Sequence, residues 1–82
     1  MVKSKLQVIN KNGLHTRPAA KLVKVASNFK SQVEISRDGF KINAKSIIGV
    51  MTLAAEYKSE IDIYIDGPDE QEALEAIMSL FK

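Results

Sequence analysis

Apolar and polar side chains alternate along several short segments of the chain, and this period of two predicts β-strands. Residues 2–9, 32–37 and 60–66 each show the alternation, and residues 40–44 form a shorter segment of the same kind. Because each predicted strand has one apolar and one polar face, we expect helices to cover a single side of a mostly antiparallel sheet.

Three other segments repeat their apolar residues at spacings of three and four, which is typical of helices with one buried face. They are residues 16–29, a short stretch at 46–53, and a last segment that begins after Asp69 and runs to about residue 81. Asp69 with Glu72 three residues later resembles a capping box at the start of the last helix. The predicted order is therefore β-α-β-β-α-β-α.

Asp38 and Gly39 separate the second and third strands, and this pair is a strong signal for a tight hairpin that needs positive φ at both positions. The apolar residues of the two strands are expected to point one way: Val33, Ile35, Phe40 and Ile42.

Length and composition fit one soluble domain over residues 1–82, because single domains usually contain at least about 50 residues. The chain has no cysteine and one histidine, so disulfides are excluded and neither a metal site nor a cofactor is expected. No apolar stretch approaches the roughly 18 residues needed to cross a bilayer, and no hydrophobic signal segment opens the chain. We therefore expect a cytoplasmic protein without membrane insertion.

Charge is distributed unevenly along the sequence. Residues 1–55 carry ten basic and two acidic side chains, whereas residues 56–82 carry two basic and eight acidic ones. A basic segment of this kind suggests nucleic-acid binding, but the polar face of the predicted sheet offers only Tyr64 as a stacking aromatic. We therefore expect no nucleic-acid partner and instead a positive face that attracts acidic proteins.

The segment at residues 12–20 contains the candidate chemistry. A helix that begins just after His15 leaves the backbone N–H groups of Thr16 and Arg17 without partners inside the helix, and Pro18 is tolerated in the first turn because its missing N–H is not needed there. Free amides, the positive end of the helix dipole and the Arg17 guanidinium together predict an anion site.

His15 supplies a nucleophile to that site. A neutral imidazole has a reference pKa of about 6.5 and can accept a phosphoryl group on nitrogen, so we predict that His15 carries a labile phosphate. From the residues alone, a capping or solvated role for His15 remains an alternative.

The segment at residues 45–54 predicts a second functional surface. Ser46 occupies the expected N-cap of the short helix. Ile47, Ile48 and Met51 group on a face that the sheet does not bury, and an exposed patch of this kind commonly marks a protein interface; filling of the core is the alternative. The predicted surface continues onto the first helix through Ala20 and Val23. Lys24 and Lys45 are expected at its rim.

Residues 13–19 (GLHTRPA) and 45–51 (KSIIGVM), at this spacing and with the predicted element order, resemble the HPr family, the histidine-containing phosphocarriers of the bacterial sugar phosphotransferase system. The resemblance covers essentially the whole chain and implies an open-faced β-sandwich. Two departures are the alanines at positions 54 and 55, where many members carry glycine, and an end at residue 82 that is a few residues short of the common length.

The resemblance implies a carrier rather than an enzyme. Nδ1 of His15 would take phosphate from phosphorylated enzyme I, with assistance from Arg17, and pass it to IIA domains of sugar permeases. Residues implied to line the docking surface for both partners are Thr16, Ala20, Ile47, Ile48 and Met51. We expect the carrier to be a monomer.

The resemblance also implies regulation at Ser46. Family members with serine at this position are substrates of an ATP-dependent kinase in carbon-catabolite regulation, so HPr kinase/phosphorylase and a catabolite-control transcription factor are further expected partners. A regulatory binding module that acts through Ile47, Ile48, Met51 and Ser46 without phosphoryl relay is the alternative function. A homologous regulatory branch lacks the active histidine, and the presence of His15 argues against membership in that branch.

Overall fold

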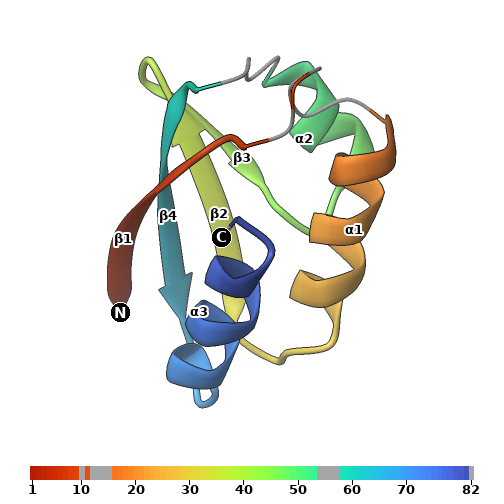
Figure 1. The fold of residues 1–82 in the computed structure, drawn as a ribbon. Coiled ribbons are helices and arrows are strands. Elements are labelled where there is room, and N and C mark those ends of the chain that lie inside the picture. Colours follow the sequence, from red (N-terminus) through yellow and green to blue (C-terminus); the bar gives the residue numbers. More distant parts are fainter. Residues whose placement is uncertain (10, 12–15, 54–57, 82) are drawn as a thin grey trace.

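The computed structural model describes residues 1–9, 11, 16–53 and 58–81 (Figure 1). Four strands and three helices follow one another in the predicted order. The elements are β1 (Val2–Gln7), α1 (Thr16–Ser27), β2 (Gln32–Arg37), β3 (Phe40–Asn43), α2 (Ile47–Thr52), β4 (Glu60–Asp66) and α3 (Glu70–Ser79).

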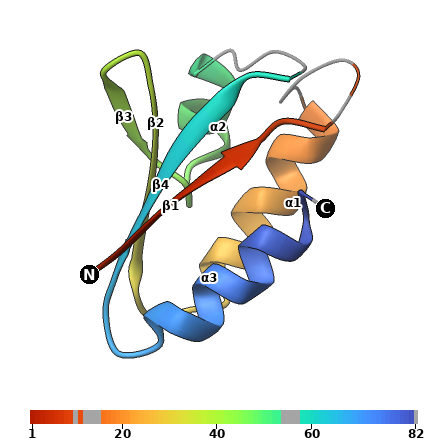
Figure 2. The same ribbon diagram turned by 60° about the vertical axis from the view of Figure 1, so that its left-hand side comes forward.

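The strands form one antiparallel sheet in the order β1-β4-β2-β3, so β1 and β3 are its edges. At the centre of the sheet, Ile63 of β4 lies opposite Ser4 of β1 and Ile35 of β2. All three helices lie on one face of the sheet (Figure 2). The predicted open-faced sandwich of sheet and helices is therefore confirmed.

The core lies between the sheet and the helix layer. Its fully buried side chains come from alternate positions of the strands and from one face of each helix, which is where the two hydrophobic periods place them. The largest are Val8, Leu22, Val33, Ile35, Val50, Ile61, Ile63, Ile65 and Ile77.

Several elements are shorter than predicted by one or two residues at an end, and β1 and α1 show why. β1 ends at Gln7, yet Val8 still pairs with the chain before β4: its N–H donates to the Ser59 carbonyl at 2.9 Å, and its carbonyl accepts from the N–H of Lys58 at 2.9 Å. α1 ends at Ser27 because the next two N–H groups bond to carbonyls three residues back, which tightens the last turn.

The capping box predicted at the start of α3 is wrong. Asp69 is the N-cap residue, but its side chain makes no capping hydrogen bond. The carboxylate instead accepts hydrogen bonds from the backbone N–H groups of Lys30 and Ser31, each at 2.9 Å, and from the Ser31 hydroxyl at 2.5 Å. These bonds fasten the connection between α1 and β2 to α3, and they hold the pKa of Asp69 down at about 2.

The β2–β3 hairpin forms as predicted, with positive φ at Asp38 (52°) and Gly39 (86°). Phe40 points the same way as Ile42, as predicted. It alternates with Ile42 on the helix-facing side of the edge strand, but its side chain is 75% exposed. Phe40 is the first residue of β3, at the turn end of the hairpin, where the helix layer leaves it uncovered.

Candidate functional site

The start of α1 is an electropositive helix end. The helix forms because Ala19, Leu22 and Ala26 bury one face completely against the sheet. Its first turn contains Arg17 and no acidic residue, so no carboxylate in that turn offsets the positive end of the dipole. Thr16 begins the helix as predicted. His15 lies outside the described residues, so its role stays a prediction.

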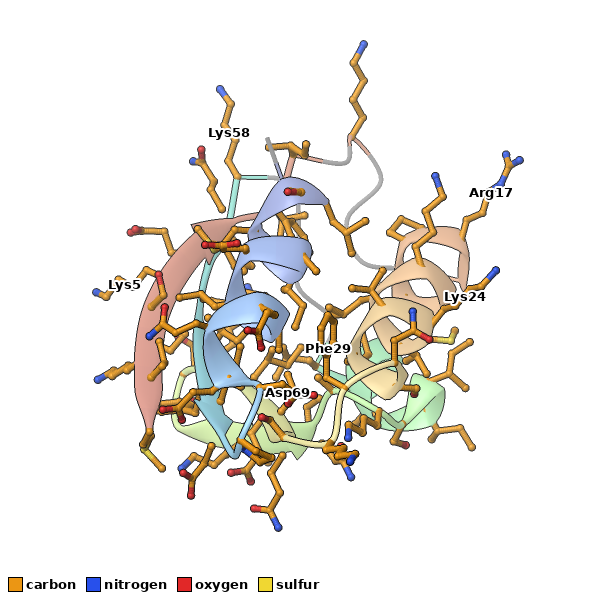
Figure 3. All side chains as sticks on the ribbon, turned by 90° about the horizontal axis from the view of Figure 1, so that it is seen from below. Lys5, Arg17, Lys24, Phe29, Lys58 and Asp69 are labelled. Atoms are coloured by element: carbon orange, nitrogen blue, oxygen red, sulfur yellow. The ribbon has the colours of Figure 1, made fainter. Side chains whose placement is uncertain are left out.

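Arg17 and Lys24 lie seven residues apart on α1, which is about two helical turns, and therefore share one face. Both residues are exposed. Figure 3 shows their side chains projecting on the same side of the helix, away from the sheet. The structure thus gives α1 a basic outer face that begins at the candidate anion site.

Ser46 caps α2 as predicted. Its backbone is extended, with φ −111° and ψ 115°, and its hydroxyl oxygen accepts a hydrogen bond from the N–H of Gly49 at 3.1 Å. The Ser46 residue is half-buried at the surface. This hydroxyl is thus partly buried, at the N-cap of a short helix.

The helix that follows exposes apolar side chains. Val50 and Leu53 are buried in the core, whereas Ile47, Ile48 and Met51 are 38%, 76% and 41% exposed. We call Ile47, Ile48 and Met51 the α2 patch. The core therefore does not account for these residues, which favours an interface over simple core filling.

α1 and α2 pack against each other, and α2 lies toward the end where α1 begins (Figure 1). Ala20 of α1 is exposed and Val23 is half-buried against the core. Both helices can therefore contribute to one surface, as the spacing predicts.

Lys45 makes a contact that the sequence did not predict. Its ammonium group donates a hydrogen bond to the carbonyl oxygen of Phe29 at 2.8 Å, and its backbone N–H donates to the side-chain oxygen of Asn43 at 2.8 Å. Phe29 follows the C-terminal end of α1, where cations are favoured. Lys45 is thus held at the far end of α1 from Arg17.

Several known proteins are similar to this chain. The family model for the HPr component of the phosphotransferase system, described by its phosphorylation site, matches residues 2–82. The phosphocarrier protein HPr of Cupriavidus necator is 51% identical over 80 residues, which are 98% of this chain and 90% of that protein. The chain belongs to the HPr family.

Solved structures agree with the assignment. HPr from Thermoanaerobacter tengcongensis superimposes with a TM-score of 0.95 at 41% identity, covering 99% of this chain and 91% of that one. Crh from Bacillus subtilis, a catabolite-repression protein described as a domain-swapped dimer, gives a TM-score of 0.80 at 46% identity and covers 99% and 93% of the two chains.

Membership identifies this HPr protein as a phosphocarrier of the phosphotransferase system rather than a catalyst. Within the described residues no cluster of histidine and acidic side chains could hold a metal ion. No helix in that part of the chain is long and apolar enough to span a membrane.

Proposed function

We propose that this HPr protein accepts a phosphoryl group on His15 from phosphorylated enzyme I and passes it to IIA domains of sugar permeases. The observation that carries the proposal is the match of the phosphorylation-site family over residues 2–82, with His15 immediately before an α1 that starts at Thr16 with an uncompensated positive end. A monomeric carrier in the cytoplasm suits this exchange between two protein partners.

In the proposed transfer, the neutral Nδ1 of His15 attacks phosphorus. A bond from phosphorus to that nitrogen forms as the bond from phosphorus to the donor side chain breaks, and the second transfer repeats the exchange toward the IIA domain. The α1 N-terminus and Arg17 stabilise the negative charge of the phosphoryl group. The Arg17 residue is exposed, so this stabilisation is modest and the group can leave again.

The docking surface in this proposal is the α2 patch with its neighbours Thr16, Ala20, Val23 and Lys24. Apolar side chains at 38–76% exposure lie near the basic face of α1, which suits an acidic partner that buries a few apolar contacts. Lys45 borders this docking surface because it lies just before α2. Its ammonium group already donates a hydrogen bond to the Phe29 carbonyl oxygen.

The relay is tested by mixing the phosphorylated carrier with a purified IIA domain and following the phosphate. We expect the carrier to lose its phosphate and the IIA domain to gain it. Carrier that keeps its phosphate in the presence of a IIA domain that other HPr proteins phosphorylate would contradict the second half of the proposal.

A second function rests on Ser46. Phosphorylation of its partly buried hydroxyl would keep an acceptor at the α2 N-cap while adding about −1.5 to −2 charges next to Ile47 and Ile48. An acidic partner would then be repelled without any change of fold. HPr kinase/phosphorylase is the proposed enzyme for this step, and a catabolite-control transcription factor the proposed reader of the modified form.

Two variants separate relay from the alternative of a pure binding module. In cells that depend on this protein for sugar uptake, the proposed relay requires His15, whereas a binding module tolerates His15→Ala and fails with Ile47→Asp. Normal sugar uptake with His15→Ala would therefore favour the binding module.

A further inference from the structure

An apolar depression of about 280 Å³ lies between the β2–β3 hairpin and the C-terminal end of α2. We call it the hairpin pocket. Its walls are Arg37, Asp38, Phe40, Ile42, Thr52 and Leu53. An apolar cavity of about 150 Å³ is enough to hold benzene, so the hairpin pocket has room for one large apolar side chain.

Phe40 forms the exposed wall of this pocket, with three quarters of its surface in contact with solvent. Among the described residues, Phe40 belongs neither to the buried core nor to the apolar side chains packed against it, so core packing does not account for an aromatic ring there. An exposed aromatic ring beside an apolar depression is typical of an interface, where aromatic residues contribute much of the binding energy.

The hairpin pocket adjoins the face of α2 that carries Ile48, because Ile48 and Thr52 are four residues apart on that helix. Thr52 lines the pocket, and its hydroxyl donates a hydrogen bond to the carbonyl oxygen of Ile48 at 2.6 Å. Ile48 is the most exposed member of the α2 patch. Figures 1 and 2 both show the hairpin turn, α2 and the start of α1 at one end of the molecule. A protein docked over Ile48 would therefore reach Phe40.

Charge at this end of the molecule favours an acidic occupant. At the pocket itself, Arg37 forms an ion pair with Asp38, with Nε 3.8 Å from Oδ2, so these two charges offset each other. The positive charge at this end comes from Arg17, in the first turn of α1, which contains no acidic residue. The acidic first turn of α3, with Glu70 and Glu72, lies at the opposite end (Figure 2). An approaching acidic protein is therefore oriented toward the start of α1 and the α2 patch, at the end of the molecule where the pocket lies.

We propose that the hairpin pocket is a second anchor point of the docking surface, filled by an apolar side chain of the acidic phosphoryl-donor protein while that protein also covers the α2 patch. The identity of this partner as enzyme I rests on the proposed function. The pocket extends the docking surface beyond the two helices onto the edge hairpin of the sheet.

The test is the dissociation constant between the full chain and unphosphorylated enzyme I, measured by isothermal titration calorimetry. Phe40→Ala should weaken binding about tenfold, as loss of an anchoring aromatic commonly does, and Phe40→Leu should retain most of the affinity. The matched control is Lys41→Ala, one residue along the same strand, whose side chain lies over the Tyr64 ring on the other face of the sheet. It should bind like the unchanged chain.

Because Phe40 is exposed, Phe40→Ala should unfold at the same urea concentration as the unchanged chain, so that a loss of binding reports the interface. Equal affinity of Phe40→Ala and the unchanged chain for enzyme I would overturn the proposal. A dimer in sedimentation equilibrium that Phe40→Ala abolishes, with enzyme I binding intact, would also overturn it and assign the pocket to a second copy of the chain.

Failure of the pocket and failure of the proposed function are distinguishable. Weaker binding with Ile48→Ala but not with Phe40→Ala would remove the pocket and leave the docking function in place. Phosphorylation of His15→Ala by enzyme I would remove the His15 assignment, while the binding measurements on Phe40→Ala would still decide the pocket.

Discussion

The ammonium group of Lys45 donates a hydrogen bond to the carbonyl oxygen of Phe29 at 2.8 Å, and so connects the residue before Ser46 to the C-terminal end of α1. Lys45 is half-buried, so the bond is shielded from water more than a surface ion pair would be. A lysine predicted to contact partners thus has a structural role, because it joins the segment before α2 to the segment that follows α1.

We expect Lys45→Met to lower the free energy of unfolding by about 1.5 kcal/mol, because a charge-assisted hydrogen bond to a backbone carbonyl is lost while the apolar stem is kept. Urea unfolding, monitored by circular dichroism, measures this free energy of unfolding. Lys24→Met is the control: that side chain is exposed on α1, and its replacement should leave stability within about 0.5 kcal/mol. Equal stability of the two variants would show that the Lys45 bond contributes nothing.

Asp69 predicts a specific loss of stability in acid. Hydrogen bonds from Ser31 and Lys30 lower its folded pKa from 3.8 to about 2, so the folded state binds the proton less readily than the unfolded chain. The stabilisation is therefore fully present above pH 4 and is lost as pH falls from about 4 to about 2.

Replacement of this carboxylate tests the prediction. Asp69→Asn should be less stable than the unchanged chain at pH 7, and the difference between the two should shrink between pH 4 and pH 2. Glu75→Gln, an exposed change on the same helix, should show no such dependence. A pH-independent difference for Asp69→Asn would mean that its charge is not what holds the α1–β2 connection.

Ser46 should show separable effects on stability and docking. Ser46→Ala removes the acceptor for the Gly49 N–H and should cost about 1 kcal/mol of stability, with little effect on binding to enzyme I. Ser46→Asp keeps a capping acceptor and should be nearly as stable as the unchanged chain, but should bind enzyme I more weakly because it adds negative charge beside Ile47. Similar binding by both variants would contradict regulation through charge.

Electrostatic attraction should be visible in the rate of phosphoryl transfer from enzyme I. Raising the salt concentration should slow the transfer, and Lys24→Glu should slow it at low salt more than at high salt. Glu72→Lys on α3, at the opposite end of the molecule, should have a much smaller effect. A transfer rate that does not depend on salt would contradict the assignment of the basic face as a docking surface.

The sequence predicted the arrangement of strands and helices well because their apolar periods are regular. The bounds of β2 and β4 follow the alternation of apolar side chains from Gln32 to Arg37 and from Glu60 to Asp66. The exposed and buried faces of α2 were also predictable, because one sheet can bury Val50 and Leu53 but not the opposite side of the same helix.

The remaining features depend on contacts between residues far apart in the chain. The capping-box pattern is defined by Asp69 and Glu72, three residues apart, whereas the Asp69 carboxylate accepts a hydrogen bond from Ser31, 38 positions away. Lys45 reaches a carbonyl 16 positions back. The exposure of Phe40 depends on where the helix layer ends above β3, which an alternating pattern does not specify.

The central claim is that His15 carries the phosphoryl group, and intact mass spectrometry after incubation with phosphoenolpyruvate and enzyme I tests it most directly. The unchanged chain should gain about 80 Da in an acid-labile linkage, the mass of one phosphoryl group on nitrogen. His15→Ala should gain nothing, whereas Ser46→Ala should be labelled like the unchanged chain. An equal mass increase in His15→Ala, or no increase in the unchanged chain, would contradict the account.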